Sequence, residues 1–113
     1  MNLQQIIDQL NLTVLTEPRD FASITTSGGY SSDLLSCVMA GAKKGHVWTT
    51  LQAHLNIVAV AALTEVAAVV ITENAQPDSA SIAKANQQGV ILLSTSLPTY
   101  EVNGKLWGMG VCN

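Results

Sequence analysis

Residues suited to binding a small anion are found where a predicted strand leads into a predicted helix. Within residues 27–33, Gly28 and Gly29 would let backbone N–H groups approach a ligand closely, because no side chain intervenes. The helix expected next adds partial positive charge at its N-terminus, and Ser32 and Asp33 supply hydrogen-bonding side chains. This arrangement favours a phosphate or carboxylate. The alternative is that both glycines only allow the positive φ angles of a tight turn, and that Asp33 caps the helix.

A second group of polar side chains follows the next predicted strand. It consists of Thr49, Gln52, His54 and Asn56, and Thr95 follows a later strand. In an open α/β sheet, ligands bind beyond the carboxyl ends of the parallel strands, so we expect these side chains to share one edge with the glycine pair. Capping of helices and turns explains the same residue types equally well, because Thr and Asn side chains bond to nearby backbone groups.

The sequence lacks the spacings that catalysis or metal binding requires. The glycine pair matches neither a P-loop nor G-x-G-x-x-G, since neither Gly-Lys-Ser/Thr nor a third glycine follows it. His46 and His54 lack the close pairing of metal ligands. Cys37, expected on or near the buried face of a helix, has no basic partner nearby in sequence to activate it. We therefore expect a protein that is not an enzyme and binds no metal, and the sequence identifies no cofactor.

The elements that position these residues alternate between strand and helix from residue 21 onward. Strands are predicted over residues 12–15, 21–26, 47–50, 67–72 and 90–94. Helices are predicted over residues 2–10, 34–42, 54–65, 77–88 and 96–106. The pattern of residues 54–65 fits helix or strand, and its length, its alanines and the following strand favour a helix. Alternation with short connections predicts one α/β domain over residues 1–113. Its sheet would be mostly parallel, with helices on its faces in two or three layers.

The composition limits the partners. Apolar residues make up 48% and charged residues 12% of the chain, whereas soluble domains carry about 25% charged residues. Some of the apolar surplus is therefore expected at a subunit interface, most simply in a homodimer. A net charge of -3, with no basic cluster beyond Lys43-Lys44, argues against nucleic acid. Without a signal peptide, or an apolar run near the roughly 20 residues that cross a membrane, we expect a cytoplasmic protein that does not contact membrane.

Three blocks of the sequence resemble the DRTGG domain family, and the resemblance extends over roughly residues 21–107. The blocks are residues 28–36, 38–43 and 48–61. The string Asp-Arg-Thr-Gly-Gly itself is replaced by Thr25-Thr26-Ser27-Gly28-Gly29. The resemblance implies a fold like the N-terminal domain of HPr kinase/phosphorylase. It also implies kinship with modules joined to CBS domains in regulated pyrophosphatases, and to phosphotransacetylase.

In those proteins the domain is an accessory part, often dimerising, and small stand-alone versions are encoded near iron-only hydrogenase subunits and sensor kinases. The resemblance therefore implies a regulatory or ligand-sensing module that binds a small anionic metabolite or nucleotide. A scaffold homodimer that binds another protein is the alternative, and an enzyme of phosphoryl or acyl transfer is the least favoured reading.

Overall fold

Five strands form a single mixed sheet in this computed structural model, which describes residues 1–113. The strand order is β1-β5-β4-β3-β2. Four neighbouring strands run parallel to one another: β2 (Gly28–Ser31), β3 (His46–Thr50), β4 (Ala68–Ile71) and β5 (Leu92–Ser94). The two-residue strand β1 (Thr13–Val14) runs antiparallel to β5 and ends the sheet. The predicted α/β class with a mostly parallel sheet is confirmed.

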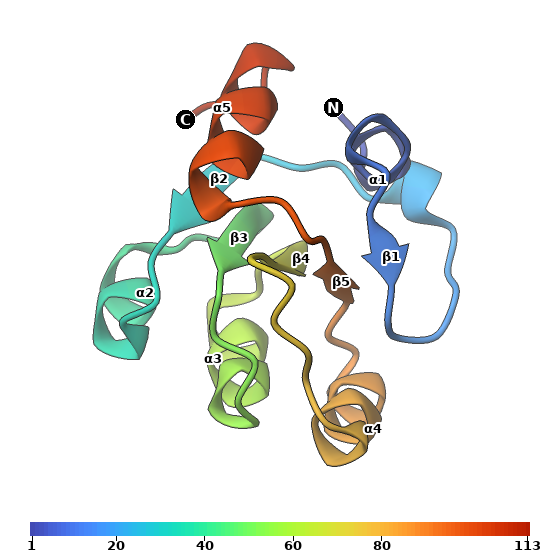
Figure 1. Ribbon diagram of the computed structural model, residues 1–113, viewed down its shortest axis with the longest axis vertical. Coiled ribbons are helices and arrows are strands. Elements are labelled where there is room, and N and C mark those ends of the chain that lie inside the picture. The colour runs from blue at the N-terminus through green and yellow to red at the C-terminus, as the bar shows by residue number, and fades with distance from the viewer.

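Helices cover both faces of the sheet, which makes three layers (Figure 1). One face carries α2 (Leu35–Gly41), α3 (Asn56–Thr64) and α4 (Ser79–Gln88). The other face carries α1 (Leu3–Leu10) and α5 (Thr99–Gly108), and both chain ends lie on this side. None of these helices has the length and apolar character needed to cross a membrane.

The central strands are buried on both sides, which explains their unbroken apolar sequences. Successive side chains of a strand point to opposite faces, so each strand contributes to two cores. Val47 and Val70 pack in the core beneath α1 and α5, whereas Trp48 and Val69 pack in the core beneath α2, α3 and α4. The helix predicted over residues 54–65 is confirmed as α3, which ends where Glu65 adopts a left-handed conformation.

The strand predicted over residues 21–26 is wrong. Phe21–Ser23 forms a single 3-10 turn instead, and the strand that pairs with β3 begins later, at Gly28. Phe21 is buried in the core beneath α1 and α5. The backbone after it is bonded to the N-terminal segment, with Leu3 N–H donating to Ile24 O at 2.9 Å. These tertiary contacts hold the segment outside the sheet despite its β-branched residues.

The segment after α5 packs on the core, because Val111 is buried there and its N–H donates to Leu106 O at 2.9 Å. The expectation that Cys37 lies on or near the buried face of its helix is wrong. Cys37 is exposed, since α2 directs Val38 into the core and turns the neighbouring Cys37 outward.

Candidate functional site

The carboxyl ends of the four parallel strands lie along one edge of the sheet (Figure 1). The connections after β2, β3 and β4 lead to helices on one face, and the connection after β5 leads to α5 on the other. Because β4 and β5 are neighbours, the two connections diverge between them. Divergence of this kind is where open α/β sheets bind ligands, since it leaves a crevice between the loops.

A polar pocket of about 500 Å³ lies at this point, and we call it the carboxyl-edge pocket. It is bounded by the end of α1, by β1, by the loops that follow β4 and β5, and by α5. Its lining consists of amide and hydroxyl side chains, two leucines and one ammonium group. The residues are Gln9, Leu10, Asn11, Thr13, Asn74, Gln76, Ser94, Thr95, Ser96, Leu97 and Lys105. Such a surface can donate and accept many hydrogen bonds and can neutralise one negative charge.

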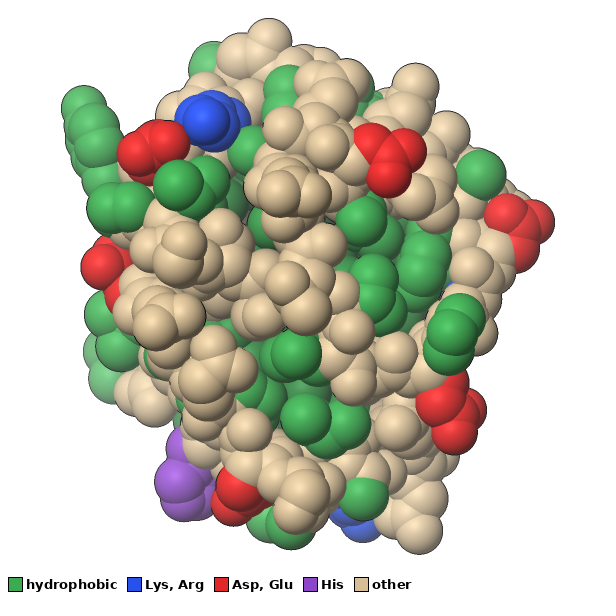
Figure 2. Space-filling view, turned by 45° about the vertical axis from the view of Figure 1, so that its right-hand side comes forward, with side chains coloured by type: hydrophobic (Ala, Val, Ile, Leu, Met, Phe, Trp, Pro, Cys, Tyr) green, Lys and Arg blue, Asp and Glu red, His purple; other side chains and the backbone are tan.

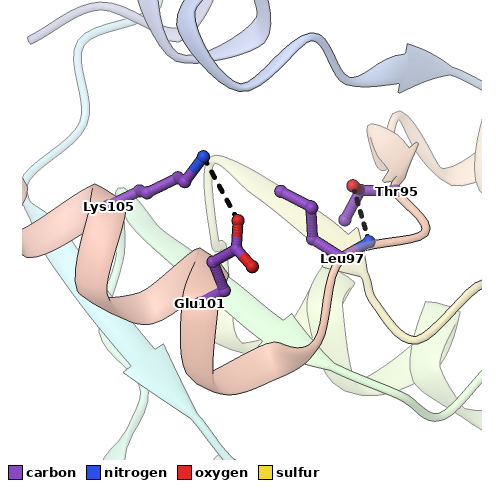
Figure 3. A network of polar contacts seen from close by, with 4 residues as sticks. All are labelled: Thr95, Leu97, Glu101 and Lys105. Carbon is purple, nitrogen blue, oxygen red and sulfur yellow. Dashed lines mark hydrogen bonds and ion pairs between the residues drawn. The ribbon is translucent and has the colours of Figure 1, made fainter.

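The single ammonium group of the pocket is held only weakly. Lys105 pairs with Glu101 one helical turn away, with Nζ and Oε2 3.3 Å apart, and about half of each side chain is exposed. Exposed pairs of this kind contribute little to stability. Figure 3 shows the Lys105 and Leu97 side chains extending toward each other over the first turn of α5. Lys105 can therefore turn from Glu101 to an incoming anion at little cost.

The loops that bound the pocket are tied together by their backbones. Asn74 N–H donates to Thr95 O at 3.1 Å, and Glu73 N–H donates to Leu97 O at 2.9 Å. The carboxylate of Glu73 also accepts a 2.7 Å bond from Thr99 N–H at the start of α5. Thr95 Oγ1 accepts from Leu97 N–H at 3.1 Å (Figure 3). The pocket is therefore preformed, which lowers the ordering cost of binding.

Asp33 and Gln52 lie close together, as predicted from the parallel strands. Their hydrogen bonds hold the loop after β2 against the loop after β3. Asp33 Oδ1 accepts bonds of 2.8 Å from both Thr50 Oγ1 and Leu51 N–H, and Gln52 Nε2 donates to Asp33 O at 3.2 Å. The expectation that Asp33 caps the following helix is wrong, because α2 has no side-chain cap. Ser32 Oγ instead accepts a 3.1 Å bond from Leu34 N–H.

His54 and Asn56 lie at the start of α3, away from the carboxyl-edge pocket lining. His54 Nδ1 accepts from Asn56 N–H at 3.3 Å, so the imidazole bonds to the backbone of the first residue of α3. The pKa of Asp78 at the start of α4 is lowered, chiefly because its carboxylate accepts from Ser81 N–H at 2.8 Å.

The glycine pair does not form a turn between strand and helix, and that prediction is wrong. Gly28 and Gly29 begin β2, opposite His46 and Val47 at the start of β3. They therefore lie at the amino end of the sheet, whereas Thr95 follows the carboxyl end of a strand. Gly28 has φ +143°, and a Cβ there would collide with the Asn113 side chain. Gly29 N–H donates to Asn113 Oδ1 at 3.0 Å.

Gly29 and Thr49 line a second pocket, of about 220 Å³, which we call the β2 pocket. It lies between the edge strand β2 and α5, and its lining is mostly apolar. The residues are Gly29, Tyr30, Ser31, Val47, Thr49, Asn103, Leu106, Trp107 and Val111. The predicted site residues are thus divided among separate places. Thr95 lines the carboxyl-edge pocket, Gly29 and Thr49 line the β2 pocket, and the ligand-binding role of each stays a prediction.

Sequence reasoning missed most of the residues that line the carboxyl-edge pocket. Asn74 and Gln76 follow the predicted strand 67–72, so the rule that selected Thr95 could also have selected them. Asn11 and Lys105 come from the end of one helix and the last turn of another. Only the packing of α1 and α5 on the same face brings them to this edge, and no local pattern reports it.

On the face of the molecule drawn in Figure 2, lysine and arginine side chains form only isolated spots, without a continuous basic surface. No group of three or more histidine, cysteine or acidic residues is arranged to hold a metal ion. The groups that line the carboxyl-edge pocket can act on a ligand through hydrogen bonds and through the charge of Lys105.

Comparison with protein-family models and with curated proteins finds no match to this chain. Among solved structures, the chain is similar to the CBS and DRTGG domains of the regulatory region of Clostridium perfringens pyrophosphatase, complexed with its activator diadenosine tetraphosphate. The TM-score is 0.74 at 12% sequence identity, covering 91% of this chain and 44% of that chain. This chain therefore spans less than half of the solved one, and the likeness shows a shared fold.

Proposed function

We propose that this protein is a non-catalytic, ligand-sensing module that binds a small anionic metabolite or nucleotide in the carboxyl-edge pocket. The observation that carries the proposal is the position of this pocket. It lies where the connections after β4 and β5 leave the sheet toward opposite faces. Open α/β sheets bind small molecules at this position because loops of different strands surround it there.

The size and lining of the pocket define the ligand class. Its volume of about 500 Å³ falls within the range of small-molecule sites. Lys105 can hold one phosphate or carboxylate group, while Asn74, Gln76 and Thr95 can bond to hydroxyl and carbonyl groups. The sugar and phosphate of a nucleoside monophosphate, or a hydroxylated carboxylic acid of similar size, match these groups best.

The structural comparison supports a regulatory role. The similar chain is a regulatory region and was solved with a nucleotide activator. By analogy, we propose that ligand binding to this module reports on a metabolite and changes its contact with a partner enzyme or signalling protein. The DRTGG resemblance supports the same assignment, and it points to partners such as iron-only hydrogenase subunits.

The proposal is tested by thermal unfolding of the protein with nucleoside monophosphates, inorganic phosphate and small hydroxy acids. A ligand at about 100 times its Kd adds about 2.7 kcal/mol to the unfolding free energy and raises Tm. Lys105→Gln should weaken binding by roughly tenfold, as expected for a charged hydrogen bond. Lys84→Gln, on the exposed side of α4, is the matched control and should leave affinity unchanged. Equal effects of both variants, or no shift with any probe, would contradict the proposal.

A second function, contact with another protein or a second copy, is favoured by exposed leucines in the loops after β2 and β3. Leu34, Leu51 and Leu55 are exposed by 61%, 45% and 44%, and Asp33 ties the loops of the first two together. We propose these leucines as part of the interface of the alternative, scaffold-type function. Leu51→Asp should then abolish dimerisation in sedimentation velocity. A monomeric wild-type protein that captures no partner would exclude it.

A further inference from the structure

The β2 pocket lies apart from the proposed sensing site. It shares no lining residue with the carboxyl-edge pocket, although α5 contributes residues to both. Two strands supply its floor, α5 supplies one wall, and the segment after α5 closes it with Val111. Its ligand must therefore be inferred independently, from its own surfaces.

The floor contains a glycine that the backbone does not require. Gly29 is outside the set of residues with positive φ, so an ordinary side chain could adopt its conformation. A Cβ at Gly29 would meet only Val47 O, at 3.4 Å, which is an ordinary contact. Glycine weakens a strand and often marks a place where another molecule approaches closely. Here the missing side chain leaves open space above the sheet, beside Val47.

The walls are apolar and uncharged. Leu106 and Trp107 come from α5, and Trp107 stays 65% exposed at the rim although its indole is largely apolar. Aromatic rings pack on one another in offset or edge-to-face arrangements, so an exposed indole at a pocket rim favours a flat ring as its partner. No charged side chain lines this pocket, which disfavours an ionic ligand.

A directed chain of hydrogen bonds ends in an available donor. Thr49 Oγ1 donates to Asn103 Oδ1 at 2.7 Å, and Asn103 Nδ2 donates to Ser31 Oγ at 2.9 Å. The Ser31 hydroxyl thus accepts one bond, and its own hydrogen has no protein acceptor. A hydroxyl so arranged is free to donate to a group in the pocket.

We propose that the β2 pocket binds a neutral aromatic heterocycle that carries a hydrogen-bond acceptor on its edge. A dry cavity of roughly 150 Å³ admits benzene, so about 220 Å³ admits one or two fused rings. The ring lies over Gly29 and beside Trp107, and its acceptor takes the hydrogen of Ser31.

Two fused-ring probes of similar size test the proposal at pH 7.5. Quinoline is neutral and has a ring nitrogen that accepts, whereas indole only donates. The ¹H–¹⁵N signals of the two tryptophan indoles report binding separately. Trp48 is fully buried, and its Nε1 donates to Ser32 O at 2.9 Å. We expect quinoline to shift the Trp107 signal saturably, to leave Trp48 in place, and to bind about three- to tenfold tighter than indole, as one hydrogen bond predicts.

Two variants test separately the open space above Gly29 and the hydrogen bond donated by Ser31. Gly29→Val fills the pocket with a residue that favours strands, so it should fold and lose the Trp107 response. Ser31→Ala should lower quinoline affinity to that of indole while leaving indole binding unchanged. Tyr100→Ala removes a 92% exposed aromatic side chain on the same helix, outside the pocket, and is the control.

Equal binding of the two probes to the wild-type protein would overturn the proposal. So would a quinoline response that survives in Gly29→Val. A Trp107 signal that shifts with protein concentration and not with either probe would show that a second copy covers the pocket, which also overturns it. If Gly29→Val fails to fold, the Ser31→Ala comparison decides alone.

Discussion

The two pockets beside α5 differ in what forms them. The carboxyl-edge pocket is built mainly from loop side chains and helix ends, and its polar groups other than Ser94 lie at the surface. The β2 pocket is built from strand and helix residues together with Val111 after α5, and several of these residues belong to the core. The carboxyl-edge pocket lies where it does because the parallel strands all end at one edge of the sheet. The β2 pocket exists because Gly29 has no side chain and because space remains between α5 and the edge strand β2. One helix thus contributes to two sites with separate physical origins.

The largest expected difference between the pockets is in stability. Leu106 lines the β2 pocket and is only 4% exposed, so Leu106→Ala should lower the free energy of unfolding by about 2–5 kcal/mol. Leu97→Ala, in the carboxyl-edge pocket, should cost clearly less, because Leu97 is only partly buried. Urea denaturation of both variants measures the contrast. Equal losses would show that the two pockets are equally part of the core.

The polar end of the β2 pocket gives the next largest effect. Asn103→Ala leaves the buried Thr49 hydroxyl without its acceptor, so it should cost about 1–3 kcal/mol in urea denaturation. Asn103→Asp keeps an acceptor for Thr49 but loses the donor to Ser31, so its cost should be smaller. If the two variants were equally unstable, the acceptor bond from Thr49 would not be the stabilising contact.

The two edges of the sheet should respond to acid at different pH. Burial and then the charge of Lys43 lower the pKa of His46 at the amino end of β3, and its Nδ1 accepts from Lys43 N–H at 3.1 Å. The unfolded chain therefore takes up this proton first, and stability falls as pH drops below about 6.5. The lowered pKa of Asp78, at the start of α4, protects that edge until pH falls below about 3.9.

Amide hydrogen exchange at pH 7, 5.5 and 3.5 measures this order. Amides near His46 should lose protection by pH 5.5, and amides in the first turn of α4 only at the lowest pH. His46→Gln should remove the first of these transitions. A simultaneous loss at both edges would contradict the assigned roles of the two groups.

The smallest expected effect is that of the ion pair at the carboxyl-edge pocket. Glu101→Gln should change the free energy of unfolding by at most about 0.5 kcal/mol, because the pair is exposed on a helix surface. It should tighten anion binding slightly, since Lys105 loses a competing partner. Thermal unfolding and phosphate titration measure the two quantities. A weaker affinity for anions in this variant would show that Glu101 helps to hold the ligand.

The parallel sheet could be predicted from sequence because its central strands carry a local signal. Residues 67–72 and 90–94 are mostly apolar at successive positions, and such a run is typical of a strand that helices cover on both faces. The strand at residues 28–31 could not be predicted, since its two glycines resemble a turn and its only support is pairing with β3. Residues 21–26, which were predicted as a strand, stay outside the sheet because Phe21 is buried in the core beneath α1 and α5.

Only those residues of the carboxyl-edge pocket that follow the end of a strand could be predicted from the sequence. The sequence predicts Thr95 as a site residue because it follows a strand, and Thr95 lines the carboxyl-edge pocket. Lys105 could not be predicted as a site residue, because the sequence does not distinguish a helical lysine that lines a pocket from one that only faces solvent. The packing of α5 on the sheet makes that difference. Asp33 and His54 bond to backbone instead: Asp33 Oδ1 accepts from Leu51 N–H in the loop after β3, and His54 Nδ1 accepts from Asn56 N–H at the start of α3.

The most direct test of the carboxyl-edge pocket is a two-dimensional NMR titration of the ¹⁵N-labelled protein with a nucleoside monophosphate. Saturable shifts in the backbone amides of Asn74, Gln76 and Thr95 and in the side-chain amides of Asn74 and Gln76, with the Gly28 and Gly29 signals unmoved, would support the proposed site. Shifts centred on Gly28 and Gly29, or none with this or any small anion tried, would contradict it.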